Sequence, residues 1–386
     1  MNTRKIQGKF SSLIEWYEKN DRPLPWRVLW AKTKDPYVVW VSEIMLQQTT
    51  IKVVEPKYRS FLNSFPNLKS LATASEDSIR EAVRGLGYYR RFRLMHQCAQ
   101  VVYSRRNTTY PEGLWPHDSR GLQELPGIGS YTAAAIASIA FSEKIAVLDG
   151  NVERVICRLF GLKVNPKEPI QKKALGKLAQ SILESGYDNN MFSELEKSLP
   201  SAHNQAMMEL GQLICTPTNP LCKECPLKQN CKSFRENTQQ EIPLVIPRKA
   251  PVPIEMHLQI ITKKKKNKIE VALFERHEQA KFLKGTRGFV SYWRNMDKKN
   301  SIEQAEKRYP LIGTVKHSIT NHKILARVTS SLEVLGPLLL TENWKRDSNL
   351  EKIQWIPAAQ VEESLVSNLD RKAWKIFQKT LVPANI

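Results

Sequence analysis

The chain has 386 residues, of which 41% are hydrophobic and 25% are charged. This composition is that of a globular protein and excludes a disordered or fibrous chain, and the length favours two domains over one. The formal net charge of +21 at pH 7 is the strongest bulk feature. Because excess lysine and arginine attract polyanions, nucleic acid is the leading candidate partner, and a basic protein without such a partner is the alternative.

Nothing in the sequence indicates a membrane protein or a secreted one. No apolar run is long enough to span a bilayer, and no basic amphipathic segment carries an aromatic face. The first ten residues are basic and polar, without the apolar core and cleavage site of a secretory signal. We therefore expect a protein of the reducing cytoplasm, associated with the nucleoid if its partner is DNA.

The first 231 residues predict a string of helices. Apolar residues between positions 10 and 231 recur mostly at three- and four-residue spacing, as in the segments 71–86 and 133–141. Prolines separate these segments at intervals that suit short connections between helices. We predict an all-α domain over residues 1–231.

The character of the chain changes after residue 231. Residues 232–253 are polar and then rich in proline, which is typical of an extended linker. Residues 254–386 predict an α+β domain, in which two strands flank an exposed basic turn at 263–266. The expected strands are 256–262, 269–274, 311–315 and 323–331, and the expected helices are 358–366 and 371–381.

Glu43 lies in a segment of apolar and amide residues, and helical spacing places Glu43, Gln47 and Thr50 on one stripe. One interpretation is the solvated face of an amphipathic helix. Against it, no lysine or arginine occurs between Lys34 and Lys52, which is unusual for an exposed face in so basic a chain. The other interpretation is a buried general acid, because apolar neighbours and amide partners raise the pKa of a carboxyl group.

Residues 119–141 predict a helix, a tight hairpin and an alanine-rich second helix. The hairpin is Leu125-Pro126-Gly127-Ile128-Gly129. Gly127 and Gly129 allow the backbone to approach a ligand closely, and N–H groups at the start of the next helix point at an anion. A DNA phosphate fits such a hairpin, and an ordinary tight turn without a ligand is the alternative.

Asp149 directly precedes an amphipathic segment, residues 152–160, and an N-cap role would be unremarkable there. The dipole at a helix N-terminus also keeps a carboxylate ionised. An ionised carboxylate is what stabilises a sugar cation during cleavage of a glycosidic bond. Because the two roles are compatible, Asp149 is a candidate catalytic residue.

Four of the six cysteines crowd into residues 215–231, with gaps of six, two and five residues. In a reducing compartment a four-thiolate metal site is the natural use of such spacing. Zinc and an iron-sulfur cluster are both possible, and the uneven gaps favour the cluster. Four unliganded cysteines are the remaining alternative. The residues are Cys215, Cys222, Cys225 and Cys231.

Together, the hairpin, the segment Leu148-Asp149-Gly150-Asn151-Val152 and the four cysteines resemble the endonuclease III superfamily of iron-sulfur DNA glycosylases. The resemblance is closer to one branch, the adenine DNA glycosylase (MutY) family. The motifs that carry it are WVSEIMLQQT at 40–49, GLGYY at 85–89 and NQAMMELG at 204–211. The motifs cover about residues 24 to 231.

The resemblance implies a helix-hairpin-helix glycosylase domain with an iron-sulfur cluster loop at 215–231, and a cofactor of the four-iron, four-sulfur (4Fe-4S) type. It implies removal of adenine mispaired with 8-oxoguanine or guanine, after the base is flipped out of double-stranded DNA. Glu43 would protonate the adenine ring nitrogen, and Asp149 would stabilise the oxocarbenium ion. Tyr131 and Asn151 would line the same pocket.

The resemblance assigns a second group of residues to the space around the orphaned 8-oxoguanine, which they would fill or wedge. These residues are Gln48, Thr49, Leu86 and Tyr88. Lyase branches of the superfamily carry a lysine two residues after the second hairpin glycine, where it forms a Schiff base. Because Tyr131 occupies that position, we expect a monofunctional enzyme that leaves an abasic site.

The family's second domain is Nudix-like and reads the oxidised guanine. The chain has no Nudix box of glutamate-rich metal ligands, so hydrolase activity is not expected there, and the family's Leu-Trp-Glu-Phe-Pro is missing near residues 288–290. The nearest counterpart of the family's Phe-Ser-His recognition loop lies at 317–322, where Asn321 replaces the histidine unless a one-residue shift places His322 at that position. Residues 28–34 are an insertion relative to the family.

From the sequence we therefore expect a monomeric adenine DNA glycosylase with no membrane contact. The alternatives are a related helix-hairpin-helix glycosylase for mismatched thymine or oxidised pyrimidines, and a non-catalytic binder of DNA damage that keeps the cluster for structure. The presence of both Glu43 and Asp149 argues against the non-catalytic binder.

Overall fold

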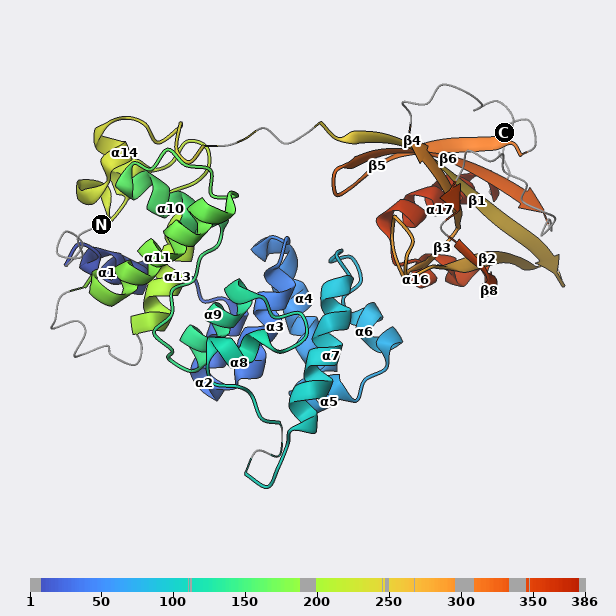
Figure 1. Ribbon diagram of the computed structural model, residues 1–386. Helices are drawn as coiled ribbons and strands as arrows, with labels where there is room; N and C mark the ends of the chain where they lie inside the picture. Colours follow the sequence, from blue (N-terminus) through green and yellow to red (C-terminus); the bar gives the residue numbers. More distant parts are fainter. Residues whose placement is uncertain are drawn as a thin grey trace. The chain divides into compact units, whose positions relative to one another are not determined.

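The computed structural model describes residues 8–109, 111, 113–187, 199–244, 246, 250–266, 268–295, 309–332, 345–346 and 348–381. The chain divides into two compact units, Met1–Pro247 and Arg248–Ile386 (Figure 1). The first unit is helical, and the second combines a β-sheet with helices. None of the described helices is both long and apolar enough to cross a membrane.

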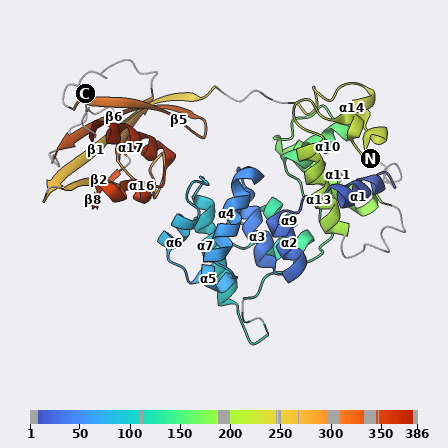
Figure 2. The same ribbon diagram turned by 180° about the vertical axis from the view of Figure 1, so that it is seen from behind.

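The first unit consists of helices joined by short connections (Figures 1 and 2). Pro25, Pro36 and Pro169 each take the first position of a helix, where the missing N–H has no partner to lose. The elements are α1 (Ser11–Asn20), α2 (Pro25–Thr33), α3 (Pro36–Leu46), α4 (Ile51–Ser64), α5 (Leu68–Ala72), α6 (Glu76–Ala82), α7 (Arg90–Ser104), α8 (Ser119–Gln123), α9 (Ser130–Ala140), α10 (Gly150–Phe160), α11 (Pro169–Ser185), α13 (Leu199–Leu213), the 3-10 turns η2 (Cys222–Glu224) and η3 (Lys228–Asn230), and α14 (Lys232–Arg235).

Two hydrophobic clusters form the core of this unit. The first joins α2 to α9 around fully buried side chains such as Trp40 and Phe61. The second joins α1, α10, α11 and α13 around side chains such as Ile156 and Leu210. Because Glu43 lies on α3 and Asp149 immediately precedes α10, the two candidate catalytic carboxylates are held by different clusters.

The segment 71–86, where the apolar spacing predicts helical structure, contains the end of α5 and the whole of α6. Between them, Ser75 caps α6 by accepting a hydrogen bond of 3.2 Å from the Ser78 backbone N–H. A serine cap thus begins a new helix within one apolar period. The helical segments expected at 133–141 and 152–160 are confirmed as parts of α9 and α10, apart from Phe141, which follows α9.

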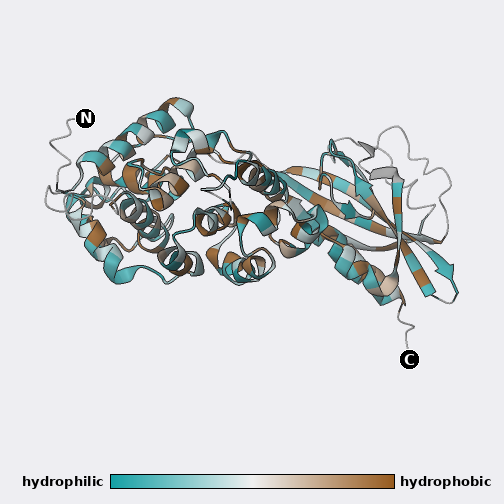
Figure 3. Ribbon diagram, turned by 90° about the horizontal axis from the view of Figure 1, so that it is seen from below, coloured by the Kyte–Doolittle hydropathy of each residue, from teal (hydrophilic) through white to brown (hydrophobic). Residues whose placement is uncertain are grey.

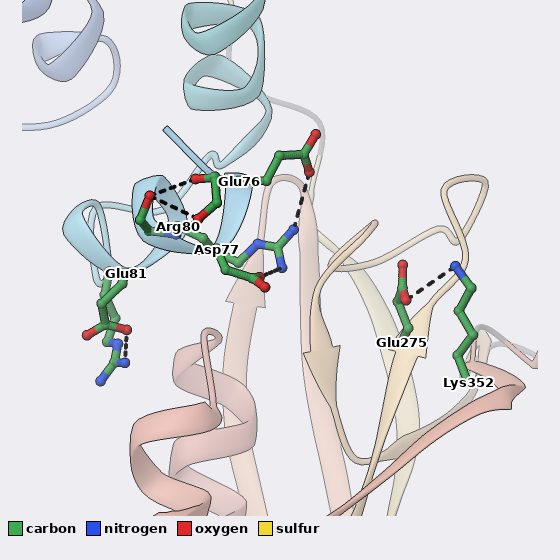
Figure 4. A network of polar contacts seen from close by, with 9 residues as sticks. Glu76, Asp77, Arg80, Glu81, Glu275 and Lys352 are labelled. Atoms are coloured by element: carbon green, nitrogen blue, oxygen red, sulfur yellow. Dashed lines mark hydrogen bonds and ion pairs between the residues drawn. The ribbon is translucent and has the colours of Figure 1, made fainter. Parts of the chain in front are cut away.

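Exposed ion pairs cover α6, as Figure 4 shows. The Arg80 guanidinium lies 3.0 Å from the Asp77 carboxylate and 3.9 Å from that of Glu76, and Arg84 pairs with Glu81. Such pairs on a solvated surface add little to stability. Helix α6 therefore depends on the burial of its one core side chain, Ile79.

The segment 232–253, which we expected to be a linker, is folded at both ends. Its first residues form α14, and Ile242 is buried in the second cluster, where its carbonyl accepts a hydrogen bond of 2.9 Å from Arg158 Nε. The first strand already begins at Val252. The prediction was wrong at these ends because the burial of Ile242 and its hydrogen bond with Arg158 hold this part of the segment in place. Residues 245 and 247–249 of this segment lie outside the described part of the chain.

The second unit is built on a sheet whose strands alternate in hydropathy, as Figure 3 shows. Its central strand pairs in parallel with one neighbour and antiparallel with two others. The elements are β1 (Val252–Lys265), β2 (Lys268–Arg276), β3 (Arg287–Gly288), β4 (Val290–Asn295), β5 (Leu311–Ile319), β6 (His322–Leu332), β7 (Lys345–Arg346), β8 (Ser348–Pro357), the 3-10 turn η4 (Ala358–Gln360), α16 (Val361–Ser364) and α17 (Asn368–Leu381). The four expected strands lie within β1, β2, β5 and β6, so these predictions are confirmed.

Helix α17 packs its apolar face on the sheet, with Trp374 and Phe377 buried against strands β1, β5 and β6. The helix is also tied to the sheet by a fully buried ion pair, in which Arg276 Nη2 lies 2.8 Å from Asp370 Oδ1 and Nη1 lies 3.0 Å from Oδ2. The exposed pair of Glu275 and Lys352, at 3.4 Å, joins β2 to β8 (Figure 4). The expected α+β character of this unit is confirmed.

Candidate active site

A cavity of about 670 Å³ lies in the helical unit, lined by residues of both hydrophobic clusters. Its walls come from α1 to α4, α9, α10 and α13. The structure brings five of the predicted site residues into this cavity. They are Glu43, Thr49, Tyr131, Asp149 and Asn151.

Asp149 is the N-cap of α10, as the sequence predicted. Its Oδ1 accepts hydrogen bonds from the backbone N–H groups of Asn151 at 3.0 Å and Val152 at 2.8 Å. Its Oδ2 accepts a further bond of 2.8 Å from the Asn151 side-chain amide. Both oxygens of this half-buried carboxylate therefore accept hydrogen bonds within the fold.

Asn151 is itself fixed by Arg154, one turn further along α10. Arg154 Nη2 donates to Asn151 Oδ1 at 2.9 Å and to the Gly211 carbonyl at 2.7 Å, and Arg154 Nε donates to the Cys215 carbonyl at 2.8 Å. Gly211 is required here, because a Cβ at this position would lie 2.6 Å from the Cβ of Asn151. This close approach of α13 to α10 orients the amide that holds Asp149.

Glu43 is 7% exposed, and its Oε2 is buried without a hydrogen-bond partner. Burial raises the pKa of this carboxyl group to about 7. A hydrogen bond with the Tyr131 hydroxyl opposes the shift, and the negative charge of Asp149 adds to it. Glu43 therefore holds a proton at neutral pH in a substantial fraction of molecules, whereas the oxygens of Asp149 accept three hydrogen bonds.

The stripe of Glu43, Gln47 and Thr50 that helical spacing predicted is absent. Helix α3 ends at Leu46, Gln48 has a positive φ of 55°, and Thr50 lies at the N-cap position of α4. The prediction was wrong because helical periodicity cannot reveal where the backbone turns. The Gln47 amide donates to Thr132 Oγ1 at 3.3 Å. Glu43 forms its hydrogen bond with the Tyr131 hydroxyl, and not with an amide as the sequence suggested.

Tyr131 lies in the first turn of α9, directly after the hairpin. Its hydroxyl oxygen lies 3.5 Å from the Met208 sulfur, and the hydroxyl bonds with the Glu43 carboxyl group. Burial and the neighbouring Glu43 raise the pKa of Tyr131 well above its usual value, so the hydroxyl stays protonated. Tyr131 therefore acts as a neutral hydrogen-bonding group at this position.

A polar cluster that sequence reasoning missed forms a further part of the site. Glu209 of α13 is 1% exposed and pairs with Arg22 and Arg27, each at 2.6 Å. Both arginines line the cavity. The sequence signal was present, since Glu209 falls in the motif at 204–211, but nothing in the sequence placed it beside Arg22.

The hairpin turns as its glycines predict. Gly127 has a φ of 77°, and a Cβ there would lie 2.7 Å from the Cβ of Leu94. Gly129 precedes α9 and is exposed together with Ser130, and no atom crowds the position of its absent Cβ. The first N–H groups of α9 have no partner within the helix, so an open anion site lies at this turn.

Arg91, which no sequence pattern indicated, joins the two loops that the resemblance places near the orphaned base. Arg91 is 7% exposed and donates to the carbonyls of Ile44, Met45 and Gln47 at the end of α3. It also donates to Thr49 Oγ1 at 3.0 Å and to the Leu86 carbonyl at 3.2 Å. Arg91 thus fixes the loop after α3 against the loop before α7.

The side chains of these loops differ in exposure. Gln48 is exposed and Tyr88 is 51% exposed, whereas Leu86 is 5% exposed and belongs to the first hydrophobic cluster. The side chain of Leu86 is packed in the core of this structure, and its expected place beside the orphaned base stays a prediction. Tyr88, with a positive φ of 48°, projects from this loop.

The four clustered cysteines surround one small cavity of about 30 Å³. Arg158, 3% exposed, places Nη1 3.5 Å from the Cys215 sulfur and donates to the Thr216 and Pro217 carbonyls at 2.6 and 3.0 Å. Among the described residues, no three His, Cys, Asp or Glu side chains form the ligand group of a single metal ion. The lining cysteines are Cys215, Cys222, Cys225 and Cys231.

In the second unit, the β5–β6 hairpin contains Asn321 and His322, the two candidates for the position of the recognition-loop histidine. Thr320, with a positive φ of 50°, and Asn321 are exposed at the turn. His322 begins β6 and packs edge-on against the Phe282 ring, with centroids 5.2 Å apart. Asn321, rather than His322, is therefore the residue at the tip.

Comparison with known proteins adds a family assignment to this geometry. Residues 41–180 match the model of the HhH-GPD superfamily of base-excision DNA repair proteins. The match spans α3, the hairpin, Asp149 and α10. Residues 41–180 of the helical unit are thus similar to this helix-hairpin-helix superfamily.

Curated proteins that are similar to the chain include adenine DNA glycosylases. That of Homo sapiens is 38% identical over 235 residues, which is 60% of this chain and 40% of the relative. That of Buchnera aphidicola subsp. Baizongia pistaciae is 38% identical over 229 residues, which is 59% of each chain. The solved structure of a thermostable thymine-DNA glycosylase is 27% identical, with a TM-score of 0.49, and covers 61% of this chain and 97% of that chain. The chain thus spans between 40% and 59% of the lengths of the two curated relatives.

The role of Arg91 in the helix-hairpin-helix unit gives a first prediction. Replacing it with methionine, of similar size but without donors, leaves buried carbonyl oxygens unpaired, and each such group costs about 1–3 kcal/mol. We expect Arg91→Met to lower the free energy of unfolding by about 2–4 kcal/mol and to weaken binding to duplex DNA. Urea unfolding and equilibrium binding at constant salt measure both effects.

The matched control is Arg80→Met, which removes an equal charge from an exposed ion pair on α6. It should change stability by less than about 0.5 kcal/mol. If Arg91→Met is as stable and binds as well as Arg80→Met, Arg91 does not hold the two loops.

Proposed function

We propose that this chain is an adenine DNA glycosylase that hydrolyses the N-glycosidic bond of adenine opposite 8-oxoguanine or guanine and leaves an abasic site. The observation that carries the proposal is the pair of carboxyl groups in one cavity with opposite environments. Glu43 is buried with a pKa raised to about 7, and both oxygens of Asp149 accept hydrogen bonds at a helix N-terminus. The similarity to adenine DNA glycosylases supports the choice of base.

In the proposed mechanism, Glu43 acts first. Its proton passes to a ring nitrogen of the extruded adenine, so that the base departs without a negative charge. A group with a pKa near 7 is suited to this transfer, because it is protonated in the free enzyme and still acidic enough to give the proton up. The Tyr131 hydroxyl keeps the carboxyl group in place through its hydrogen bond.

Asp149 acts as the bond to the base breaks and positive charge develops on the sugar. An ionised carboxylate fixed before the reaction stabilises this charge without reorganisation. A water molecule then adds to the sugar carbon and gives up a proton to solvent, which leaves the abasic sugar and free adenine. Asn151, held by Arg154, keeps the carboxylate oriented. Because their environments differ, Glu43 serves as the acid and Asp149 as the group that stabilises positive charge.

The polar cluster of Arg22, Arg27 and Glu209 supplies the remaining side of the pocket. The two guanidinium groups line the cavity and are held rigid by the buried carboxylate. Fixed N–H donors of this kind match the ring-nitrogen acceptors of a purine. We propose that this cluster contacts the edge of the adenine that Glu43 does not reach.

A monofunctional reaction follows from the residue at position 131. A Schiff-base mechanism needs a lysine amine beside the sugar, and Tyr131 cannot supply one. The chain should therefore release the base and leave the DNA strand intact.

Duplex DNA would be held by the exposed hairpin at Gly127 and Gly129, whose open turn suits a phosphate. The net charge of +21 supports binding through the DNA backbone. Gln48, Thr49 and Tyr88, on the loops joined by Arg91, would occupy the space around the orphaned base.

For the second unit we propose a Nudix-like domain that contributes to recognition of the base opposite adenine. A mixed sheet with a parallel β1–β6 pair, covered by α17, supports this assignment. Asn321 at the exposed tip of the β5–β6 hairpin is the residue we assign to this contact. An amide both donates and accepts hydrogen bonds, so it can pair with the altered edge of an oxidised guanine.

We propose that the four cysteines hold an iron-sulfur cluster of the 4Fe-4S type. The donor set fits, because four thiolates around one cavity provide the soft ligands that such a cluster requires. Cys215, Cys222, Cys225 and Cys231 would each bind one iron, and Arg158 would lie beside the Cys215 sulfur. When bound, the cluster supplies cross-links between α13, η2, η3 and α14.

The function is tested by incubating the full chain with a duplex that contains adenine opposite 8-oxoguanine. We expect free adenine and an unbroken strand with an abasic site. Asp149→Asn and Glu43→Gln should each lower the single-turnover rate by at least about 100-fold while binding to the duplex persists. Absence of adenine release by the wild-type chain would refute the function, and release of thymine or oxidised pyrimidines in its place would support the related glycosylases.

The pH dependence tests Glu43. Since the acid must be protonated to act, the single-turnover rate should fall as the pH rises through about 7. Tyr131→Phe removes a hydrogen bond that lowers the pKa of Glu43, so in this variant the fall should begin at a higher pH. A rate that stays constant from pH 5.5 to 9, or a fall at the same pH in both proteins, would be inconsistent with Glu43 as the acid.

The cofactor is tested by the visible absorption spectrum of protein purified without oxygen. An iron-sulfur cluster gives a broad charge-transfer band, which Cys225→Ser should weaken or abolish together with the stability of the helical unit. The control is Cys98→Ala, because Cys98 is buried in the first hydrophobic cluster away from the four ligands. A colourless protein that contains zinc would contradict the cluster.

A further inference from the structure

Helix α2 carries two tryptophans one turn apart, and the second lies in the inserted segment 28–34. Trp26 and Trp30 both line the active-site cavity. An i,i+4 spacing places two side chains on the same face of a helix. The insertion therefore adds an aromatic group to the wall of the pocket.

The two rings differ in what surrounds them. Trp26 is 7% exposed and meets the Tyr58 ring edge-on, with centroids 5.4 Å apart, so it is a core residue. Trp30 is only half-buried and packs against the outside of the same cluster. The Lys34 ammonium lies over its ring, 5.3 Å from the centroid. Trp30 thus borders the cavity while Lys34 lies at the surface beside it.

Other residues of the same cavity give its wall an apolar and basic character. Leu46 and Ile51, from the end of α3 and the start of α4, line the same cavity, as does the exposed Lys52. An aromatic ring bordered by ammonium groups is the combination that binds a nucleotide, because the ring stacks on the base and the charges attract phosphate. The cavity of about 670 Å³ is also larger than a purine, so a base needs a wall of this kind to be held in one position.

We propose that Trp30 is a stacking wall for the extruded purine, and that Lys34 and Lys52 attract the phosphates that flank it. The inference rests on the proposed function, because it assigns a residue to the binding of the same substrate. In this arrangement the base is held by Trp30 through its face, while Glu43 reaches its ring nitrogen.

The experiment compares Trp30→Ala with Trp30→Phe, which keeps an aromatic face. The control is Val28→Ala on the same helix, since Val28 is 39% exposed and does not line the cavity. Each substitution is made in the full chain, and thermal unfolding verifies that the variants are folded. A second set of the same variants also carries Glu43→Gln, so that the base in the bound DNA is not released.

The first readout is fluorescence of 2-aminopurine placed opposite 8-oxoguanine in the duplex. An extruded 2-aminopurine is bright when free of neighbours and quenched when stacked on tryptophan. We expect Trp30→Ala to give a brighter complex than the parent protein and Val28→Ala to match the parent. A role limited to the packing of α2 would not change this signal.

The second readout is the single-turnover rate of adenine release at limiting enzyme. Loss of one base–aromatic stacking contact should lower it by about 5- to 100-fold in Trp30→Ala, with most activity retained in Trp30→Phe. Equal fluorescence and equal rates in Trp30→Ala and Val28→Ala would overturn the role of Trp30. If the wild-type chain releases no adenine, the proposed function fails, and the fluorescence comparison still decides the stacking, because it does not need turnover.

Discussion

Asp149 occupies the start of α10, where two backbone N–H groups and the Asn151 amide donate hydrogen bonds to its carboxylate. The chemistry of the site depends on this arrangement, since an ionised carboxylate must persist beside a second carboxyl group. The second group, Glu43, lies on α3 in the other hydrophobic cluster and is buried without comparable donors. The negative charge of Asp149 adds to the effect of burial and raises the pKa of Glu43. The fold thus gives two carboxyl groups in one pocket different surroundings.

Several parts of this site could be predicted from the sequence because they depend on local rules. Asp149 was expected as an N-cap, and the amphipathic period of α10 follows it directly. The absence of lysine and arginine between Lys34 and Lys52 indicated that α3 is buried, and every residue from Tyr37 to Met45 is buried. The two glycines of the hairpin indicated a tight turn before α9.

Other parts depend on contacts between distant segments, which no local pattern contains. Arg91 is one of several arginines at the start of α7, and only the fold shows that it bonds to carbonyls of α3. Leu86 matched a wedge motif and is instead packed in the core. The break after Leu46 was missed because the apolar residues continue with helical spacing past the point where the backbone turns at Gln48. Trp30 likewise became significant only when its place on the cavity wall was known.

The central claim is that burial raises the pKa of Glu43 to about 7 in the cavity that it shares with Asp149. Infrared difference spectroscopy of the free protein measures this directly, because a protonated carboxyl group absorbs separately from a carboxylate. The account predicts a carboxyl band that titrates near pH 7 in the wild-type chain and is missing in Glu43→Gln. A spectrum in which no carboxyl group titrates above pH 5.5, or in which the band persists in Glu43→Gln and vanishes in Asp149→Asn, would contradict it.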